Sequence, residues 1–343
     1  MSTPSPGATT SSRDGRPAGR RKRGGGEQSM VPDADFRSYY GMPVVKPSPW
    51  KADIPTYIFF GGLSAGSSLL AAGGDLTDRP VLRRAGRLAA LVGMTATMTT
   101  LVHDLGRPSR FLNMLRTVKL TSPMSVGSWI LAAYGPVAGV AAVAELVDML
   151  PGRRRRRAVQ LVARLGRPAG LFAALTAPPV AAYTAVLLAD TATPSWHEAY
   201  RELPFVFVGS AAAAAGGLGM ITTPVDEAGP ARRMAVGGAL LELVAEQQME
   251  PSMGIAAEPL QQGRAGRLMT ASKVLTATGA AGALVAGRSR VAGVVSGAAL
   301  LAGSVCTRFG IFEAGQESAR DPKYTVAPQR ERLDSGRPIR HAP

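Results

Sequence analysis

A histidine, a carboxylate and two arginines occur close together at the end of a long apolar run, between His103 and Arg110. Histidine exchanges protons near neutral pH, and the adjacent Asp104 could hold the charged imidazole or relay its proton. Arg107 and Arg110 would favour the ionised form of that carboxylate. The pattern predicts a catalytic pair, His103 and Asp104. The alternative is an interfacial helix cap whose arginines reach toward lipid headgroups.

Three tyrosines, Tyr57, Tyr134 and Tyr183, lie inside apolar stretches. A phenol can donate a hydrogen bond to a quinone carbonyl while its ring lies against the quinone face. The alternatives are an aromatic anchor at the membrane interface and a hydrogen bond between helices. Pro178 and Pro179 come about one turn before Tyr183, and such prolines kink membrane helices and free backbone carbonyls, as is common around a pocket.

Two carboxylates, Glu242 and Glu246, occur four residues apart in a weaker apolar run and therefore share one helix face. An ionisable side chain at mid-membrane costs about 2.5 to 3.5 kcal/mol on insertion scales, so such a residue is a functional candidate. The pair predicts a proton path, or else a helix face that borders a wet crevice.

Membrane helices must position these residues. The chain has 343 residues, of which 46% are hydrophobic and 18% are charged, and soluble domains carry roughly 25% charged residues. A helix that crosses a bilayer needs roughly 20 mostly apolar residues. Eight stretches approach this pattern: 54–74, 86–102, 123–144, 168–189, 203–225, 234–245, 268–287 and 291–307. We expect an all-α integral membrane protein, a bundle of about eight transmembrane helices.

The regions outside the spans are polar. Residues 1–50 are rich in Ser, Pro, Gly and Arg without an apolar run, which is typical of a disordered basic tail. Residues 51–310 form the expected transmembrane bundle, and residues 311–343 a polar C-terminal extension. Glycine and alanine fill the spans, as in Ala211–Ala215, and small residues let membrane helices pack closely.

The rare residue types exclude several functions. The single cysteine, Cys306, cannot form an intrachain disulfide or hold an iron–sulfur cluster, which needs about four thiolates. Three histidines cannot supply the axial ligands of a di-haem cytochrome b. The formal net charge of +15 comes from tails and loops and lacks a basic module interleaved with aromatic residues, so it does not indicate nucleic-acid binding.

Loop charges predict an orientation in a cell membrane. The arginine run Arg153–Arg157 and most other loop arginines follow the odd-numbered spans. The positive-inside rule then places this run in the cytoplasm and both tails outside. The basic N-terminal tail favours the opposite orientation, and we give the short loop more weight.

A series of ordered motifs resembles the NrfD-like proteins, the membrane anchors of polysulfide-reductase-type complexes. The motifs are Tyr40–Lys46 with Trp50, Ile54–Gly62, His103–Pro108, Ser122–Trp129, Ala182–Thr184, Pro194–Trp196, Leu203–Phe207, Arg308–Gly310 and Glu313–Ser318. They extend from about residue 40 to residue 324. Their order and spacing carry the resemblance, since no single motif is diagnostic.

The resemblance implies an eight-helix, haem-free anchor that exchanges electrons with a quinone such as menaquinone or ubiquinone. It implies a ferredoxin-like iron–sulfur partner, often joined to a molybdopterin subunit. The family's quinone headgroup is held by the first and fourth helices, which here points to Tyr57 and Tyr183 with the segment His103 to Arg107 beside them. We expect the partner to dock on the side that holds both tails.

Two other functions stay open from the sequence. Glu242 and Glu246 would suit a proton- or ion-translocating subunit or a transporter, although no internal repeat of the kind common in transporters is evident. A purely structural anchor without quinone is the third reading.

Overall fold

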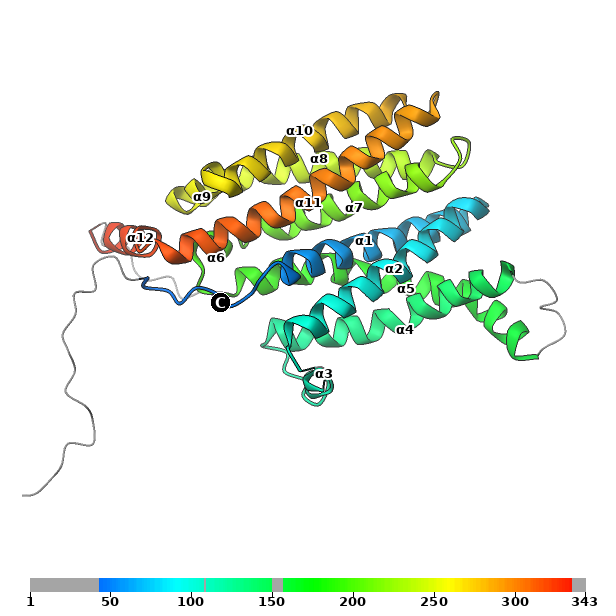
Figure 1. Ribbon diagram of the computed structural model, residues 1–343, viewed down its shortest axis with the longest axis horizontal. Coiled ribbons are helices and arrows are strands. Elements are labelled where there is room, and N and C mark those ends of the chain that lie inside the picture. The colour runs from blue at the N-terminus through cyan, green and yellow to red at the C-terminus, as the bar shows by residue number, and fades with distance from the viewer. Residues whose placement is uncertain (1–42, 108, 150–156, 335–343) are drawn as a thin grey trace, which may run out of the picture. The chain divides into compact units, whose positions relative to one another are not determined.

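The computed structural model describes residues 43–107, 109–149 and 157–334, all of which lie in one compact unit, Gly41–Pro343. These residues form helices and no strand (Figure 1). The helices are α1 (Asp53–Leu76), α2 (Pro80–Asp104), α3 (Arg110–Met114), α4 (Pro123–Met149), α5 (Arg157–Ala189), α6 (Pro194–Glu198), α7 (Leu203–Thr222), α8 (Gly229–Ser252), the 3₁₀ turn η2 (Gly254–Ala257), α9 (Glu258–Gln261), α10 (Gly263–Val285), α11 (Arg290–Arg320) and α12 (Lys323–Asp334).

Seven of the described helices are long and apolar enough to cross a membrane: α1, α2, α4, α5, α7, α10 and α11. The expected all-helical membrane protein is confirmed. The remaining expected span corresponds to α8, which is as long as α1 but carries Arg232, Arg233, Glu242 and Glu246, and these charges lower its hydropathy. The number of spans is therefore seven by this measure, with α8 packed beside α7 (Figure 1).

The long helices form two groups. Helices α1, α2, α4 and α5 pack together, and α7, α8, α10 and α11 form the second group. The two groups meet where α1 packs against α7 and α11, and where α5 packs against α7. Successive long helices run in opposite directions, so their connections gather at two ends (Figure 1). One end holds the segments that contain α3, α6, η2 and α9.

Close approach between helices depends on glycine. A Cβ atom on Gly216 would lie 2.5 Å from the backbone nitrogen of Ala235, and a Cβ on Gly238 would lie 2.5 Å from that of Ala213. Backbone therefore contacts backbone between α7 and α8. The prediction of close packing through small residues is confirmed.

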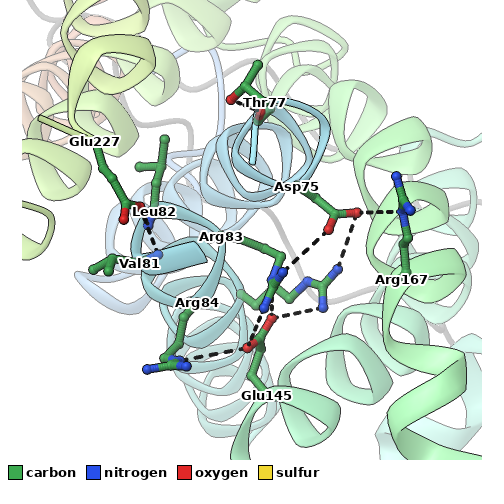
Figure 2. Close-up of polar contacts among 11 residues, drawn as sticks. Asp75, Thr77, Val81, Leu82, Arg83, Arg84, Glu145, Arg167 and Glu227 are labelled. Carbon is green, nitrogen blue, oxygen red and sulfur yellow. Dashed lines mark hydrogen bonds and ion pairs between the residues drawn. The ribbon is translucent and has the colours of Figure 1, made fainter. Parts of the chain in front are cut away.

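A network of buried charges fastens the first helix group at the end of the molecule where α1 ends. The Glu145 carboxylate on α4 accepts hydrogen bonds from Arg83 Nε at 2.6 Å and Arg87 Nη1 at 3.0 Å, and Asp75 on α1 lies 3.2 Å from Arg167 Nε on α5. Figure 2 shows Arg83, Arg84 and Arg167 gathered around the two carboxylates. The network joins α1, α2, α4 and α5.

A carboxylate from the loop between α7 and α8 caps α2 beside this network. Glu227 Oε2 accepts hydrogen bonds from the backbone nitrogens of Val81 at 2.8 Å and Leu82 at 3.2 Å (Figure 2). It thereby satisfies free N–H groups of the first helical turn.

The C-terminal region is more regular than the sequence suggests. Helix α11 continues past the expected end of the bundle at residue 310, because Ile311, Phe312 and Ala314 bury an apolar face. In α12, Lys323 donates a hydrogen bond to Glu258 on α9, which raises the pKa of the lysine. The basic tail 1–42, Arg153–Arg156 and residues 335–343 lie outside the described residues.

Candidate functional site

A cavity of about 70 Å³ lies between α1, α2, α4 and α5 at the end of the bundle that holds α3. Its walls are mainly apolar, with Ile54 and Ile58 from α1, Leu101 from α2 and Leu131 from α4. Polar groups enter from four helices: Tyr57, Asp104, Ser128, and Tyr183 with Thr184. Largely apolar walls with a few convergent polar groups are the usual form of a small-molecule site.

Tyr57 and Tyr183 meet inside the bundle. Both side chains are buried, and their ring centroids lie 6.4 Å apart with the ring planes at 78°. An aromatic pair in this edge-to-face arrangement is favourable. Gly127 on α4 makes room for it, because a Cβ atom there would lie 2.5 Å from the ring of Tyr183. The structure therefore brings together the two tyrosines that the family resemblance singled out.

The structure separates the residues of the segment from His103 to Arg107. Asp104 faces the cavity, whereas His103 and Arg107 are exposed and are not among its lining residues. Consecutive side chains on a helix point about 100° apart. His103 therefore points away from the cavity, and its Nδ1 lies 3.1 Å from Asp53 Oδ1 on α1.

The expected arginine partners of Asp104 take other positions. Arg110 Nη1 donates to the carbonyl of Leu105 at 3.5 Å, and Arg107 extends from the surface. Within the part of the protein that the structure describes, neither arginine forms an ion pair with Asp104. The sequence argument also missed Asp53, for which the available signal was an acidic residue in the first turn of α1.

Of the three tyrosines, Tyr134 forms the hydrogen bond between helices that was the alternative to a quinone contact. Its hydroxyl lies 2.8 Å from the hydroxyls of Ser64 and Ser68, and it donates to the carbonyl of Ser64 at 2.8 Å. The side chain is fully buried. It therefore serves as a hydrogen-bonded contact between α4 and α1, outside the cavity.

Comparison with known proteins identifies a family that matches the helices around the cavity. The family described as "Polysulphide reductase, NrfD" matches residues 43–227. This match covers more than half of the sequence, including every residue that lines the cavity. The chain belongs to the NrfD family. The resemblance drawn from the sequence motifs is thus confirmed.

One curated relative extends this finding. The NrfD-family protein is 30% identical over 149 residues to the C subunit of polysulfide reductase from Wolinella succinogenes. The aligned part spans 40% of the NrfD-family protein and 47% of the relative, so it covers less than half the length of that subunit.

Trp50 closes one side of the cavity in this NrfD-family protein, just before α1. Its ring stacks on Trp196 of α6 with centroids 5.9 Å apart, and Trp196 in turn contacts Phe312 of α11 at 5.6 Å. Gln316 Nε2 donates to the carbonyls of Ser48 and Trp50 at 3.1 and 3.2 Å. Helix α11 thus holds the segment that precedes α1 against the cavity.

A second polar cluster lies in the other helix group of the NrfD-family protein. Glu242 Oε1 accepts a hydrogen bond from Thr307 at 2.6 Å, and the Thr307 hydroxyl lies 2.5 Å from that of Ser272. Arg308 is fully buried; it donates to the carbonyl of Phe207 at 2.7 Å and covers the Phe207 ring.

Several atoms of this second cluster have no hydrogen-bond partner. They are Glu242 Oε2, both carboxylate oxygens of Glu246, and Nε and Nη1 of Arg308. The predicted pair of glutamates is buried, and the sequence argument assigned no role to the arginine beside them. Glu242, Glu246 and Arg308 lie beyond the residues that the family matches. No group of three or more metal-ligating side chains occurs among the residues described.

Proposed function

We propose that this NrfD-family protein is the haem-free, quinone-reactive membrane anchor subunit of an iron–sulfur/molybdopterin-type oxidoreductase complex. In this role it exchanges electrons between the quinone pool of the cytoplasmic membrane and a ferredoxin-like partner subunit. The supporting observation is the convergence of Tyr57, Asp104 and Tyr183 on one cavity inside the family-matched helices.

The cavity suits a quinone headgroup in size and donors. Its volume of about 70 Å³ has room for about five water molecules, on the order of one substituted quinone ring. Leucine and isoleucine walls suit the ring faces, and the phenols of Tyr57 and Tyr183 can donate to its carbonyls. When bound, the quinone accepts or gives two electrons and two protons.

The polar residues near the cavity would then transfer protons between the quinone and solvent. Asp104 faces the cavity and can hold a proton at its carboxylate. His103 and Asp53 form a pair on the water-exposed side of the same helix ends, where the imidazole can exchange protons with solvent. Arg107 is exposed and does not line the cavity, so we assign it no part in this proton transfer.

We test the assignment with Tyr57→Phe, Tyr183→Phe and Asp104→Asn in the assembled complex. Each tyrosine variant loses one hydrogen bond to the quinone, worth about 0.5 to 1.5 kcal/mol, so we expect a rise of roughly 2- to 12-fold in the quinone dissociation constant. Asp104→Asn should slow quinone turnover more than it weakens binding, because it removes a proton carrier. The measurements are quinone-linked electron transfer and quinone affinity.

Tyr134→Phe is the matched control, because Tyr134 lies outside the cavity. Unchanged affinity and turnover in all three cavity variants would refute the site. One quinone retained per purified protein would dismiss the alternative of a purely structural anchor.

The docking side follows from where the cavity lies. Electron transfer requires a short distance between quinone and the partner's nearest cluster, and the cavity lies at the end that holds α3 and α6. Segments 43–52, 109–122, 190–202 and 253–262 lie at this end (Figure 1), and a hydrogen bond from Ser195 Oγ to the carbonyl of Ala256 at 2.7 Å joins two of them. We propose this end as the docking side.

A second candidate function is proton or ion translocation. The buried oxygens of Glu242 and Glu246 that lack a hydrogen-bond partner favour it, because burying such a carboxylate is costly and makes the residue a functional candidate. In liposomes that contain the complex, Glu246→Gln should abolish proton movement coupled to quinone turnover and leave the turnover itself within about twofold.

Exposed Glu317→Gln serves as the control for this test. If Glu246→Gln keeps coupled proton movement, or changes only thermal stability, the glutamates have a structural role.

A further inference from the structure

We infer that a groove between the start of α4 and the end of α5 holds the polyprenyl tail of the quinone whose ring occupies the cavity. This inference rests on the proposed function and adds a second subsite, with an apolar polyprenyl group as its ligand. Tyr183 forms the boundary between the two subsites.

The groove has a volume of about 290 Å³ and lies on the outside of the helix group. Leu120 and Pro123 at the start of α4, Val126 on α4 and Val186 on α5 give it apolar walls. Leu120 is 83% exposed and Val186 47% exposed, so the groove opens to the surroundings of the protein. Asp190 marks the polar end.

Tyr183 is the wall shared by groove and cavity, since its side chain lines both. Gly127 leaves the space in which the Tyr183 ring lies against α4. The ring therefore stands where a tail would pass from the cavity to the groove.

The size of the cavity requires such an exit. It has room for one ring, and every isoprene unit of a tail adds five carbon atoms that the cavity cannot hold. Another groove, beside Met98, Val102 and His103 on the outer face of α2, shares no lining residue with the cavity. Continuity therefore favours the groove between α4 and α5.

The surface beyond the groove suits the same ligand. Leu175 and Pro179 on α5 are exposed on the face that continues from Val186, at spacings of four and seven residues. No charged residue lies between Leu175 and Val186. A tail that leaves the groove at Val186 would reach the lipid along an apolar helix face.

The test compares a quinone without a tail and one with a tail, using the full-length protein in lipid nanodiscs. The probes are menadione, which is the bare methylnaphthoquinone, and menaquinone with four isoprene units. Quenching of tryptophan fluorescence reports binding, because Trp50 lines the cavity. Val186→Phe fills the groove, and Leu120→Glu places a charge at its wall in a loop where helix packing is not disturbed.

We expect both variants to weaken the tailed quinone about tenfold and to leave menadione within about twofold of wild type. Val143→Phe, at an exposed α4 position away from the groove, should change neither. Equal effects on both quinones, or no effect on the tailed quinone, would overturn the tail site. Failure of wild type to bind menadione would instead refute the proposed function.

Discussion

At the scale of single residues, the buried charges of the protein serve two different tasks. The Glu145 carboxylate accepts hydrogen bonds from Arg83 and Arg87, although Arg87 Nε and Asp75 Oδ2 in the same network have no hydrogen-bond partner. Around Glu246 both carboxylate oxygens lack a partner. Removing one partner of a buried ion pair is costly, whereas a buried carboxylate without a hydrogen-bond partner requires an explanation, for which we propose the proton path.

The first of these tasks predicts a loss of stability. Glu145→Gln leaves the guanidinium groups of Arg83 and Arg87 without their shared counter-charge inside the helix group. Removing one partner of a buried ion pair costs about 3 to 5 kcal/mol. We expect a clear fall in the thermal unfolding temperature of the purified protein, measured by tryptophan fluorescence.

Glu317→Gln, whose ion pair with Arg320 is exposed, should leave the unfolding temperature unchanged because exposed pairs contribute little. An equal response of both variants would mean that the Glu145 network does not hold the first helix group together.

At the scale of the elements, small residues decide how closely α7 and α8 approach. Backbone packs against backbone at Gly216 and Ala235, where neither helix can accept a larger side chain. Close backbone approach is what drives helix association in lipid, where burial of apolar surface gives little. Glu242 lies on the same interface, where a Cβ atom on Gly209 of α7 would lie 2.5 Å from its backbone nitrogen.

Gly216→Ala should therefore force α7 and α8 apart despite the better helix propensity of alanine. Overpacking costs about 1 to 3 kcal/mol, more than the roughly 0.5 to 1 kcal/mol that alanine contributes in a helix. We expect a lower unfolding temperature in detergent. Gly237→Ala on α8 has open space around the added methyl and should be neutral or stabilising. The reverse order of the two variants would contradict this account of the packing.

At the scale of the whole molecule, the long helices alternate in direction, so the loops that connect them lie at two ends of the bundle. The orientation in the membrane decides which end faces the cytoplasm. Arginines in the first turns of α2, α8 and α11 lie opposite the end that holds α3 and the cavity; they are Arg83, Arg84, Arg232, Arg233 and Arg290. From the positive-inside rule we predict that the arginine-rich end lies in the cytoplasm. The cavity and the proposed docking side then face outward.

Thiol labelling of intact cells tests this orientation. Cys306 is the single cysteine and is replaced by alanine first. Ser109→Cys, at the α3 end, should react with a membrane-impermeant maleimide from outside, whereas Thr77→Cys, after α1, should react only after lysis. The opposite pattern would invert the orientation and place the docking side in the cytoplasm.

Much of the fold and part of the candidate site could be predicted from the sequence. Long uncharged runs predict the helices, since the bilayer demands length and apolarity that can be counted. The helix ends were less accurate: α4 runs to Met149 and α11 to Arg320, beyond the apolar runs. The extension of α4 holds Glu145 in a buried ion pair, and the extension of α11 buries Ile311, Phe312 and Ala314; neither contact is visible as hydropathy.

The sequence by itself determined that this is an all-helical membrane protein of the NrfD family, since these properties follow from local apolarity and ordered motifs. Only the tertiary structure decided which polar residues share a space. It turns Asp104 toward the cavity and His103 toward Asp53, and it joins Glu145 to arginines far away in the sequence. Side-chain direction and partner choice depend on helix rotation, and packing between helices sets that rotation.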